Sequence, residues 1–290
     1  MIETFLKHIE YEKRYSTHTL TAYRKDLNQF EEFLHDTFEI DNTLEVIHPQ
    51  LRSWVVELID NGQSPKTVNR KIATLKSYYK FLVLREYLEA NPTSRLKPLK
   101  TDKPLPVFIR ESEMNVLLDQ VIFNDDLQGA RDRLILEMLY NTGIRLSELI
   151  GLKISDVSFY QNTIKVLGKR NKERLIPIHD FLVKLIKKYL LFRNKEDASI
   201  YLITTENGSQ LYPMLVYRTV KKYLEIITTQ SKTSPHVLRH TFATHLLNKG
   251  ADLNAVKDLL GHTSLAATQV YTHNSMEKLK SAFDQAHPKA

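Results

Sequence analysis

A helix is predicted to begin in the sequence Ser234-Pro235-His236-Val237-Leu238-Arg239-His240-Thr241. The serine is a good N-cap, and proline suits the first helical position because no N–H is needed there. Gly250 marks the expected end of the helix. His236 and Arg239 are three residues apart and therefore share a face of the first turn. Two such donors beside a helix N-terminus predict an anion-binding site.

Plainer roles for these residues stay open. His236 could be a core histidine, and Arg239 could form a single salt bridge. His236 and His240 also have the spacing of a zinc pair on a helix. The glutamate of the familiar zinc-binding helix is missing and no third ligand is apparent, so no metal is expected.

Upstream, the sequence Thr142-Gly143-Ile144-Arg145-Leu146-Ser147-Glu148-Leu149 predicts a sharp break between two helices. Gly143 is expected to close the first helix, and Arg145 stands where the next helix starts. A backbone held in this way would aim the planar guanidinium at one target. Helix capping, or an ion pair with Glu148, is the alternative role for this arginine.

Downstream, the sequence Leu259-Leu260-Gly261-His262-Thr263-Ser264 predicts that a short helix ends and that His262 lies in a tight turn. Tyr271 follows at the end of the next expected helix. Taken singly, a histidine after glycine is usually a turn residue, and a tyrosine is usually half-buried packing.

Together, these side chains suit a reaction at one phosphodiester. Two arginines can bind its non-bridging oxygens and stabilise the pentavalent state. A tyrosine can attack phosphorus, and its pKa of about 10 means that imidazoles and guanidiniums would assist proton loss. A lysine can protonate the departing oxygen. Lys169 is the candidate, although a solvated loop charge is its plainer role and Arg170 and Lys172 are equally eligible.

The second part of the chain is predicted to be mostly helical with a small antiparallel sheet. Residues 163–166 and 174–178 have the composition of a hairpin, and 157–159 of a further short strand. Helices are expected at residues 111–121, 128–141, 180–192, 213–227, 235–248, 253–260 and 265–271.

The first hundred residues are predicted to be all helical. An amphipathic run from Leu20 to Leu34 follows the N-cap candidates at 16–17, and a second run spans Leu51 to Ile59. Residues 92–106 contain four prolines with lysines between them, which is typical of a basic linker. The expected organisation is a helical domain at 1–100, a linker at 101–107 and a second domain at 108–290.

A third helix of this first domain is predicted to start at Ser64-Pro65 and to have two distinct faces. Its apolar stripe consists of Val68, Ile72, Leu75, Tyr79 and Leu82. The opposite face consists of Lys66, Arg70, Ala73, Ser77 and Lys80.

Basic residues concentrate around this helix. Residues 64–110 hold 11 Lys or Arg against 3 acids, and no acid lies between Lys66 and Arg85. A solvated face is the common reading of such residues, but a solvated face usually alternates in sign. The stripe therefore favours a polyanion partner. The DNA-binding candidates are Lys66, Arg70, Lys71, Lys76, Lys80, Arg170 and Lys172.

Composition excludes several classes of protein. Without cysteine the 290-residue chain has no disulfides, thiolate zinc sites or cysteine nucleophiles. Its first residues lack the apolar run of a signal peptide, and no stretch is long enough to span a membrane. We expect a cytoplasmic, nucleoid-associated protein that needs no cofactor, because each transesterification keeps the bond energy and no phosphate-binding loop is present.

Six of these residues together resemble the active site of tyrosine recombinases, the phage-integrase-type family. They are Arg145, Lys169, His236, Arg239, His262 and Tyr271. The phrases 142–149, 168–174, 236–243 and 260–262 are similar to those of its bacterial Xer subgroup. The resemblance extends over essentially the whole chain. It implies a mainly α fold in which an N-terminal core-binding domain and a catalytic domain with a small antiparallel sheet form a C-shaped clamp on DNA.

The resemblance also implies roles for single residues. Arg145 and Arg239 would hold the scissile phosphate, and Tyr271 would attack it to give a 3′-phosphotyrosyl link and a free 5′-hydroxyl. Lys169 would be the general acid for the 5′-oxygen. His236 would assist proton transfer, and His262 would hydrogen-bond the phosphate. Arg170 departs from the glycine that is common in the group.

The partners implied are a specific double-stranded DNA site and three further protomers. A tetramer on two sites would form through a C-terminal helix with Met276, Leu279 and Phe283 on one edge. A paralogous recombinase or an activator protein could take part, and chromosome dimer resolution is the expected role. Alternatives are a mobile-element integrase or DNA invertase, a relaxing enzyme of the type IB topoisomerase kind, and a DNA-binding protein without catalysis.

Overall fold

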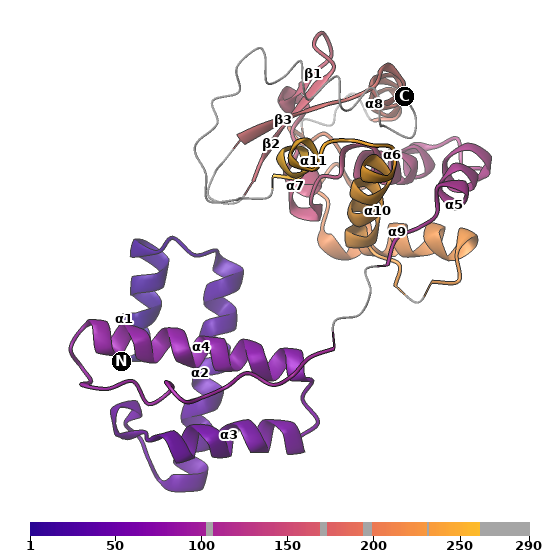
Figure 1. Cartoon of the computed structure of the whole chain (residues 1–290). Helices are drawn as coiled ribbons and strands as arrows, with labels where there is room; N and C mark the ends of the chain where they lie inside the picture. The colour runs from indigo at the N-terminus through magenta and orange to yellow at the C-terminus, as the bar shows by residue number, and fades with distance from the viewer. Residues whose placement is uncertain (103–106, 169–172, 194–198, 231, 262–290) are drawn as a thin grey trace. The chain divides into compact units, whose positions relative to one another are not determined.

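The computed structural model describes residues 1–102, 107–168, 173–193, 199–230 and 232–261. The chain divides into two compact units, Met1–Pro104 and Leu105–Ala290, each with its own hydrophobic core. Figure 1 shows the helices and strands of both units. Among the described residues, no helix is both long enough and apolar enough to cross a membrane.

The first unit is helical, as the sequence predicts. Ser16 and Ser64 each accept a hydrogen bond at 3.3 Å from a backbone N–H of the helix that they precede, which confirms both as N-caps. The described elements are α1 (Ile2–Lys7), a π-helical turn (His8–Glu12), α2 (Thr17–Phe38), a 3₁₀ turn (Thr43–Glu45), α3 (His48–Asp60) and α4 (Pro65–Leu84). Helix α4 contacts α1, α2 and α3 and so forms the centre of this unit.

The two faces of α4 are as predicted. Its apolar stripe is buried in a core that also contains Phe30 and Trp54, whereas Lys66, Arg70 and Lys80 are exposed on the other face. Burial of the stripe fixes the rotation of the helix and therefore turns the basic face outward.

Lys71 does not belong with these surface cations, which corrects its selection as a DNA-binding candidate. Its side chain is only 3% exposed, and its Nζ donates to Gln29 and lies 3.5 Å from Asp26. Burial lowers the pKa of Lys71. Asp26 comes from α2 and also pairs with Arg70. An acid that is distant in the sequence therefore contacts the basic residues of α4.

The first part of the proline-rich stretch 92–106 packs on this unit. The Asn69 side chain donates to the Leu99 carbonyl at 2.9 Å and accepts from the Leu99 N–H at 2.7 Å. Leu96 is buried in the same core. Residues 92–99 are therefore part of the folded unit, which the proline spacing did not indicate.

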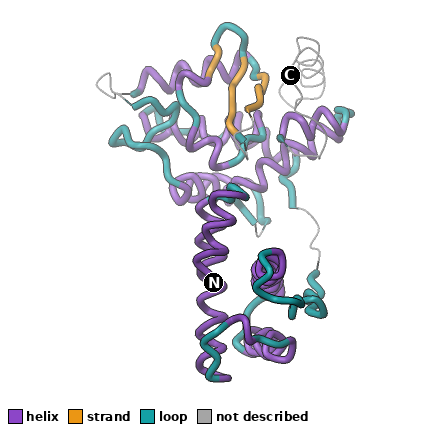
Figure 2. The backbone as a smooth tube through the Cα atoms, turned by 90° about the vertical axis from the view of Figure 1, so that its left-hand side faces the viewer, coloured by secondary structure: helices purple, strands orange, loops and turns teal. Residues whose placement is uncertain are grey.

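In the second unit, the antiparallel sheet has the strand order β1-β2-β3, with Ile164 opposite Ile176 at its centre. Figure 2 shows the strands as a small orange sheet among purple helices. The described elements are α5 (Glu111–Asn115), a π-helical turn (Val116–Gln120), α6 (Leu127–Thr142), α7 (Leu146–Gly151), a 3₁₀ turn (Ile154–Asp156), β1 (Val157–Ser158), β2 (Thr163–Leu167), β3 (Glu173–Pro177), α8 (Asp180–Phe192), α9 (Pro213–Ile227), α10 (Pro235–Asn248) and α11 (Leu253–Leu260).

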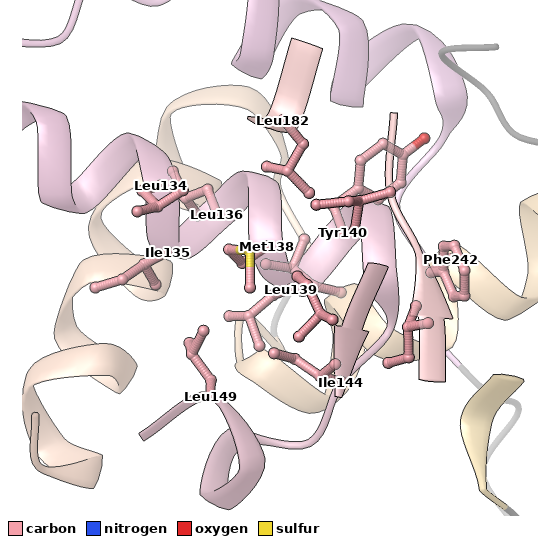
Figure 3. Packing of buried hydrophobic residues seen from close by; sticks show 14 of the residues in the cluster. Leu134, Ile135, Leu136, Met138, Leu139, Tyr140, Ile144, Leu149, Leu182 and Phe242 are labelled. Carbon is pink, nitrogen blue, oxygen red and sulfur yellow. The ribbon is translucent and has the colours of Figure 1, made fainter. Parts of the chain in front are cut away.

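Helix α6 lies in the middle of this unit and contacts α7, α8, α9 and α10. Its residues Leu134–Thr142 are all buried, so neighbouring elements cover this part of the helix on every side (Figure 3). Phe242 from α10 and Leu182 from α8 complete the core around it. This packing fixes the end of α6, where the candidate residues begin.

The fold class is confirmed: the chain is mainly helical and carries a small antiparallel sheet. Helices α8, α9, α10 and α11 have the predicted bounds, and β2 and β3 form the predicted hairpin. The serine at 234 precedes α10 as expected, although its side chain makes no capping hydrogen bond. The helix predicted at 265–271 lies outside the described residues.

Candidate active site

Arg145 lies at the turn from α6 into α7. Gly143 ends α6 in the left-handed conformation, with φ +58°, and Arg145 is the N-cap residue of α7. The Arg145 N–H donates to Glu148 Oε2 at 2.7 Å, and its Nη1 donates to Glu148 Oε1 at 2.8 Å. Its Nη2 donates to the Gly261 carbonyl at 2.9 Å. The ion pair between Arg145 and Glu148, which the sequence offered as an alternative, is therefore present. It orients the Arg145 guanidinium, and the Arg145 side chain is 25% exposed.

Arg239 reaches the same place from α10. Its residue is buried, and its guanidinium donates to the carbonyls of Gly143 and Leu260, the latter at 2.6 Å. Burial, followed by the nearby positive charge of Arg145, lowers the pKa of Arg239 to about 10. The side chain remains charged at neutral pH. Each of the two arginines uses two guanidinium N–H groups in these bonds, out of the five that an arginine carries.

A third arginine completes the cluster. Arg174 on β3 donates from Nη1 and Nη2 to the two oxygens of Glu148, both at 2.8 Å, and from Nε to the Leu259 carbonyl at 2.7 Å. Burial would raise the pKa of Glu148, but hydrogen bonds and charge from Arg174, together with Arg145, lower it to about 2. The carboxylate is therefore ionised at any working pH and balances part of the positive charge.

The last turn of α11 is the common target of the three arginines. The consecutive carbonyls of Leu259, Leu260 and Gly261 accept from Arg174, Arg239 and Arg145, respectively. These carbonyls stand at the negative end of the helix, where cations are favoured. Gly261 has φ +64° and turns the chain out of the helix. Helix α11 therefore ends at the arginine cluster.

The other candidate residues lie partly on α10 and partly outside the described structure. His236 is exposed in the first turn of α10, one turn before the buried Arg239, and His240 is half-buried. Among the described residues there is no group of three His, Asp or Glu side chains that could hold a metal ion. Several candidates lie outside the described residues: Lys169, Arg170, Lys172, His262 and Tyr271. The connection that contains Lys169 joins β2 to β3, the strand of Arg174.

Comparison with known proteins identifies the family. Residues 107–278 match the model of the phage integrase family, and residues 2–86 match the phage integrase N-terminal SAM-like domain. The chain belongs to the phage integrase family. As a tyrosine recombinase it is an enzyme that cuts and rejoins DNA in Xer-like site-specific recombination.

Curated relatives of this recombinase match over nearly their full length. The tyrosine recombinase XerC of Chlorobaculum parvum is 38% identical, with 100% of this chain and 94% of the relative covered. The XerC of Staphylococcus epidermidis is 40% identical, with 99% and 97% covered.

Solved structures share its fold. The XerH recombinase bound to a palindromic difH substrate, in a post-cleavage complex, has a TM-score of 0.74 at 24% identity, with 97% of this chain and 82% of that chain covered. The Tn1549 transposon integrase in complex with circular intermediate DNA has a TM-score of 0.71 at 21% identity, with 95% and 97% covered.

Sequence reasoning about the recombinase gave Arg174 no role, although position 174 lies in the predicted strand 174–178. The signal was the two-residue period of β3, which sets Arg174 on the same face as the buried Ile176. An arginine on the inward face of a strand needs a buried acceptor. Its partner Glu148 is 26 residues away and could not be named from the strand alone.

Gly143 in the recombinase allows a direct test of the turn before Arg145. A Cβ there would come closer than 3.0 Å to both Phe242 and Leu260, and φ is positive. We expect Gly143→Ala to lower the free energy of unfolding by about 2 to 4 kcal/mol, the sum of left-handed strain and overpacking. Chemical denaturation measures the loss. Gly151→Ala is the matched control, because a Cβ there meets nothing within 4 Å. Equal effects of the two substitutions would contradict this account.

Proposed function

We propose that the arginine cluster holds one scissile phosphate while Tyr271 attacks it. Arg145 and Arg239 would donate to the two non-bridging oxygens and stabilise the pentavalent phosphorus. The Tyr271 oxygen would form the new bond to phosphorus as the bond to the 5′-oxygen breaks. The product would be a 3′-phosphotyrosyl link and a 5′-hydroxyl, which the reverse reaction rejoins to a new partner strand.

Three further residues would move or hold protons in this proposal. Lys169 would protonate the departing 5′-oxygen, His236 would assist proton loss from the tyrosine, and His262 would hydrogen-bond the phosphate. No nucleotide or metal is needed, because one phosphoester replaces another.

One observation carries the proposal: the guanidiniums of Arg145 and Arg239 donate to neighbouring carbonyls, those of Gly261 and Leu260. They come from helices that are far apart in the sequence, and packing brings them to one point. Two cations held side by side, one buried and one partly exposed, repel each other unless an anion joins them. Glu148 balances one charge, and a phosphate would balance the next.

The domain roles follow the same proposal. Residues 1–100 would be the core-binding domain, 101–107 the linker and 108–290 the catalytic domain, and the two domains would close on the duplex as a clamp. The exposed basic face of α4 would lie on DNA, with Lys66, Arg70 and Lys80 on phosphates or in a groove and Lys76 beside them. Arg170 and Lys172 would add contacts from the hairpin connection.

The biological role we propose is resolution of chromosome dimers, in the cytoplasm at the nucleoid. Its support is that the curated relatives cited above are named XerC and that XerH is described as bound to its difH substrate. A paralogous recombinase would share the site. The competing roles are those of a mobile-element integrase, an invertase or a relaxing enzyme of the topoisomerase kind.

A plasmid assay tests this function. The DNA site is recovered by mapping where the Tyr271→Phe protein binds the genome, and two copies are placed on a supercoiled plasmid. We expect excision or inversion between the copies and no relaxation of a plasmid without the site. Relaxation independent of the site would favour the topoisomerase alternative.

A truncation tests the proposed assembly. Residues 275–290, which lie outside the described residues, would insert into a neighbouring protomer of a tetramer. We expect removal of 275–290 to leave the affinity for a single site within about twofold, because the candidate DNA-binding and catalytic residues all remain. Synapsis of two sites should be abolished, because the segment that would join the protomers is gone. Gel-shift assays measure both. Full recombination by the truncated chain would dispose of this role for the tail.

A further inference from the structure

Arg174 is a buried cation that the proposed chemistry does not use. Its side chain is 4% exposed and that of its partner Glu148 is 2% exposed. The Arg174 guanidinium binds both oxygens of Glu148 and the Leu259 carbonyl, so its Nε, Nη1 and Nη2 atoms all point at the protein. A phosphate contact is therefore not its role.

Arg174 and its two partners belong to three separate segments. Arg174 itself is on β3, whose connection to β2 contains Lys169. Glu148 is on α7 and receives two hydrogen bonds from Arg145, one from the guanidinium and one from the backbone. Leu259 is on the last turn of α11. One side chain thus joins β3, α7 and the last turn of α11.

The fit around Arg174 is close. A Cβ at Gly261 would lie 3.1 Å from Arg174 Nη1 and 3.2 Å from its Cδ. Glycine at the end of α11 therefore serves two purposes, the positive φ and the approach of the arginine. The guanidinium and the helix end are packed against each other and leave little room for either to shift.

We propose that Arg174 is a positioning residue for strand cleavage, which holds Glu148 and the end of α11 so that the guanidiniums of Arg145 and Arg239 are held in place for the phosphate. This inference rests on the proposed function. A misplacement of about 1 Å at a reacting centre can cost about a hundredfold in rate. A lysine at this position would keep the charge but could not hold two carboxylate oxygens and a carbonyl in a fixed fork.

A buried salt bridge can also be purely structural, and pH separates the two roles. Among the residues that the structure describes, the charged groups that face Glu148 are Arg145 from the start of α7, Arg174 from β3 and Arg239 from α10. At the ends of α6 and α11, the arginines bind backbone carbonyls. Loss of Arg174 would remove the largest of the interactions that lower the pKa of Glu148, so this pKa would rise from its present low value while the two hydrogen bonds from Arg145 still lower it. A protonated Glu148 would release Arg145 as the pH falls.

The experiment uses the full chain and a nicked duplex of the site recovered by genome mapping, on which cleavage is trapped. For Arg174→Gln we expect duplex affinity within about twofold of wild type and cleavage at neutral pH slower by about a hundredfold. The ratio of variant to wild-type rate should fall further at lower pH. The double variant Glu148→Gln with Arg174→Gln should be slow with a ratio that is independent of pH, because residue 148 no longer titrates.

Arg193→Gln is the matched control. Arg193 is also a buried arginine of this unit, and it donates to the carbonyls of Ser199, Tyr201 and Leu202 rather than to the cluster. We expect its loss to lower the melting temperature without changing the pH profile of cleavage.

Two results would overturn the proposal. One is wild-type cleavage by Arg174→Gln. The other is a rate ratio for Arg174→Gln that is constant with pH and equal to that of Arg193→Gln. If Arg174→Gln does not fold, Arg174→Lys decides, since the proposal requires slow cleavage and wild-type cleavage by that variant refutes it. Failure of the wild-type protein to form any adduct would instead count against the proposed function.

Discussion

Tyr271→Phe is expected to bind its DNA site with wild-type affinity and to form no covalent adduct. The substitution removes only the phenolic oxygen, which would become the bridging atom of the phosphotyrosyl link. A nicked duplex that traps the cleaved strand measures adduct formation on a denaturing gel. We expect the yield to fall below detection, while the gel-shift affinity stays within about twofold.

Tyr212→Phe is the matched control for this substitution. Tyr212 is an exposed tyrosine of the same unit that precedes α9 and makes no contact with the arginine cluster in the described structure. Its loss should leave adduct formation unchanged. An adduct at normal yield from Tyr271→Phe would refute the nucleophile assignment.

Arg239→Ala is expected to slow cleavage by about a hundredfold to a thousandfold, the effect of removing one donor that stabilises a transition state. Arg239 is buried, and its pKa of about 10 keeps it charged at neutral pH. It also holds the carbonyls of Gly143 and Leu260. Its loss would therefore remove a positive charge from beside the phosphate. It would also break the hydrogen bond that Arg239 makes to the end of α11. Single-turnover cleavage of the nicked duplex gives the rate.

Arg239→Lys separates these two effects. A lysine keeps the positive charge but has no fork with which to reach two carbonyls and a phosphate. We expect it to recover a small part of the lost rate. Arg133→Ala, which removes an arginine that is 41% exposed on α6, should cleave like wild type. Wild-type cleavage by Arg239→Ala would show that the cluster does not hold the phosphate.

Sequence reasoning succeeded where the signals are local. The bounds of α8 to α11 follow from caps, prolines and the spacing of apolar residues, all within a few positions of each helix end. The same kind of signal placed Gly143 and Arg145 at a helix break. The buried stripe of α4 follows from a period that needs no knowledge of the partner helices.

Sequence reasoning failed where distant residues decide the outcome. Lys71 resembles its basic neighbours in sequence, but Asp26 and Gln29 from α2 draw it into the core. Residues 92–99 have the composition of a linker, but Asn69 binds their backbone. The bond between Arg174 and Glu148 likewise depends on packing between β3 and α7. Such pairings depend on tertiary contacts, which local patterns in a single sequence do not reveal.

The most direct measurement is to identify the residue that becomes linked to DNA. The wild-type protein is trapped on the nicked duplex and digested with protease and nuclease, and the DNA-bearing peptide is sequenced by mass spectrometry. The account predicts a phosphotyrosine linked to a 3′-nucleotide at Tyr271. A link at any other residue, or at a 5′-phosphate, would contradict it.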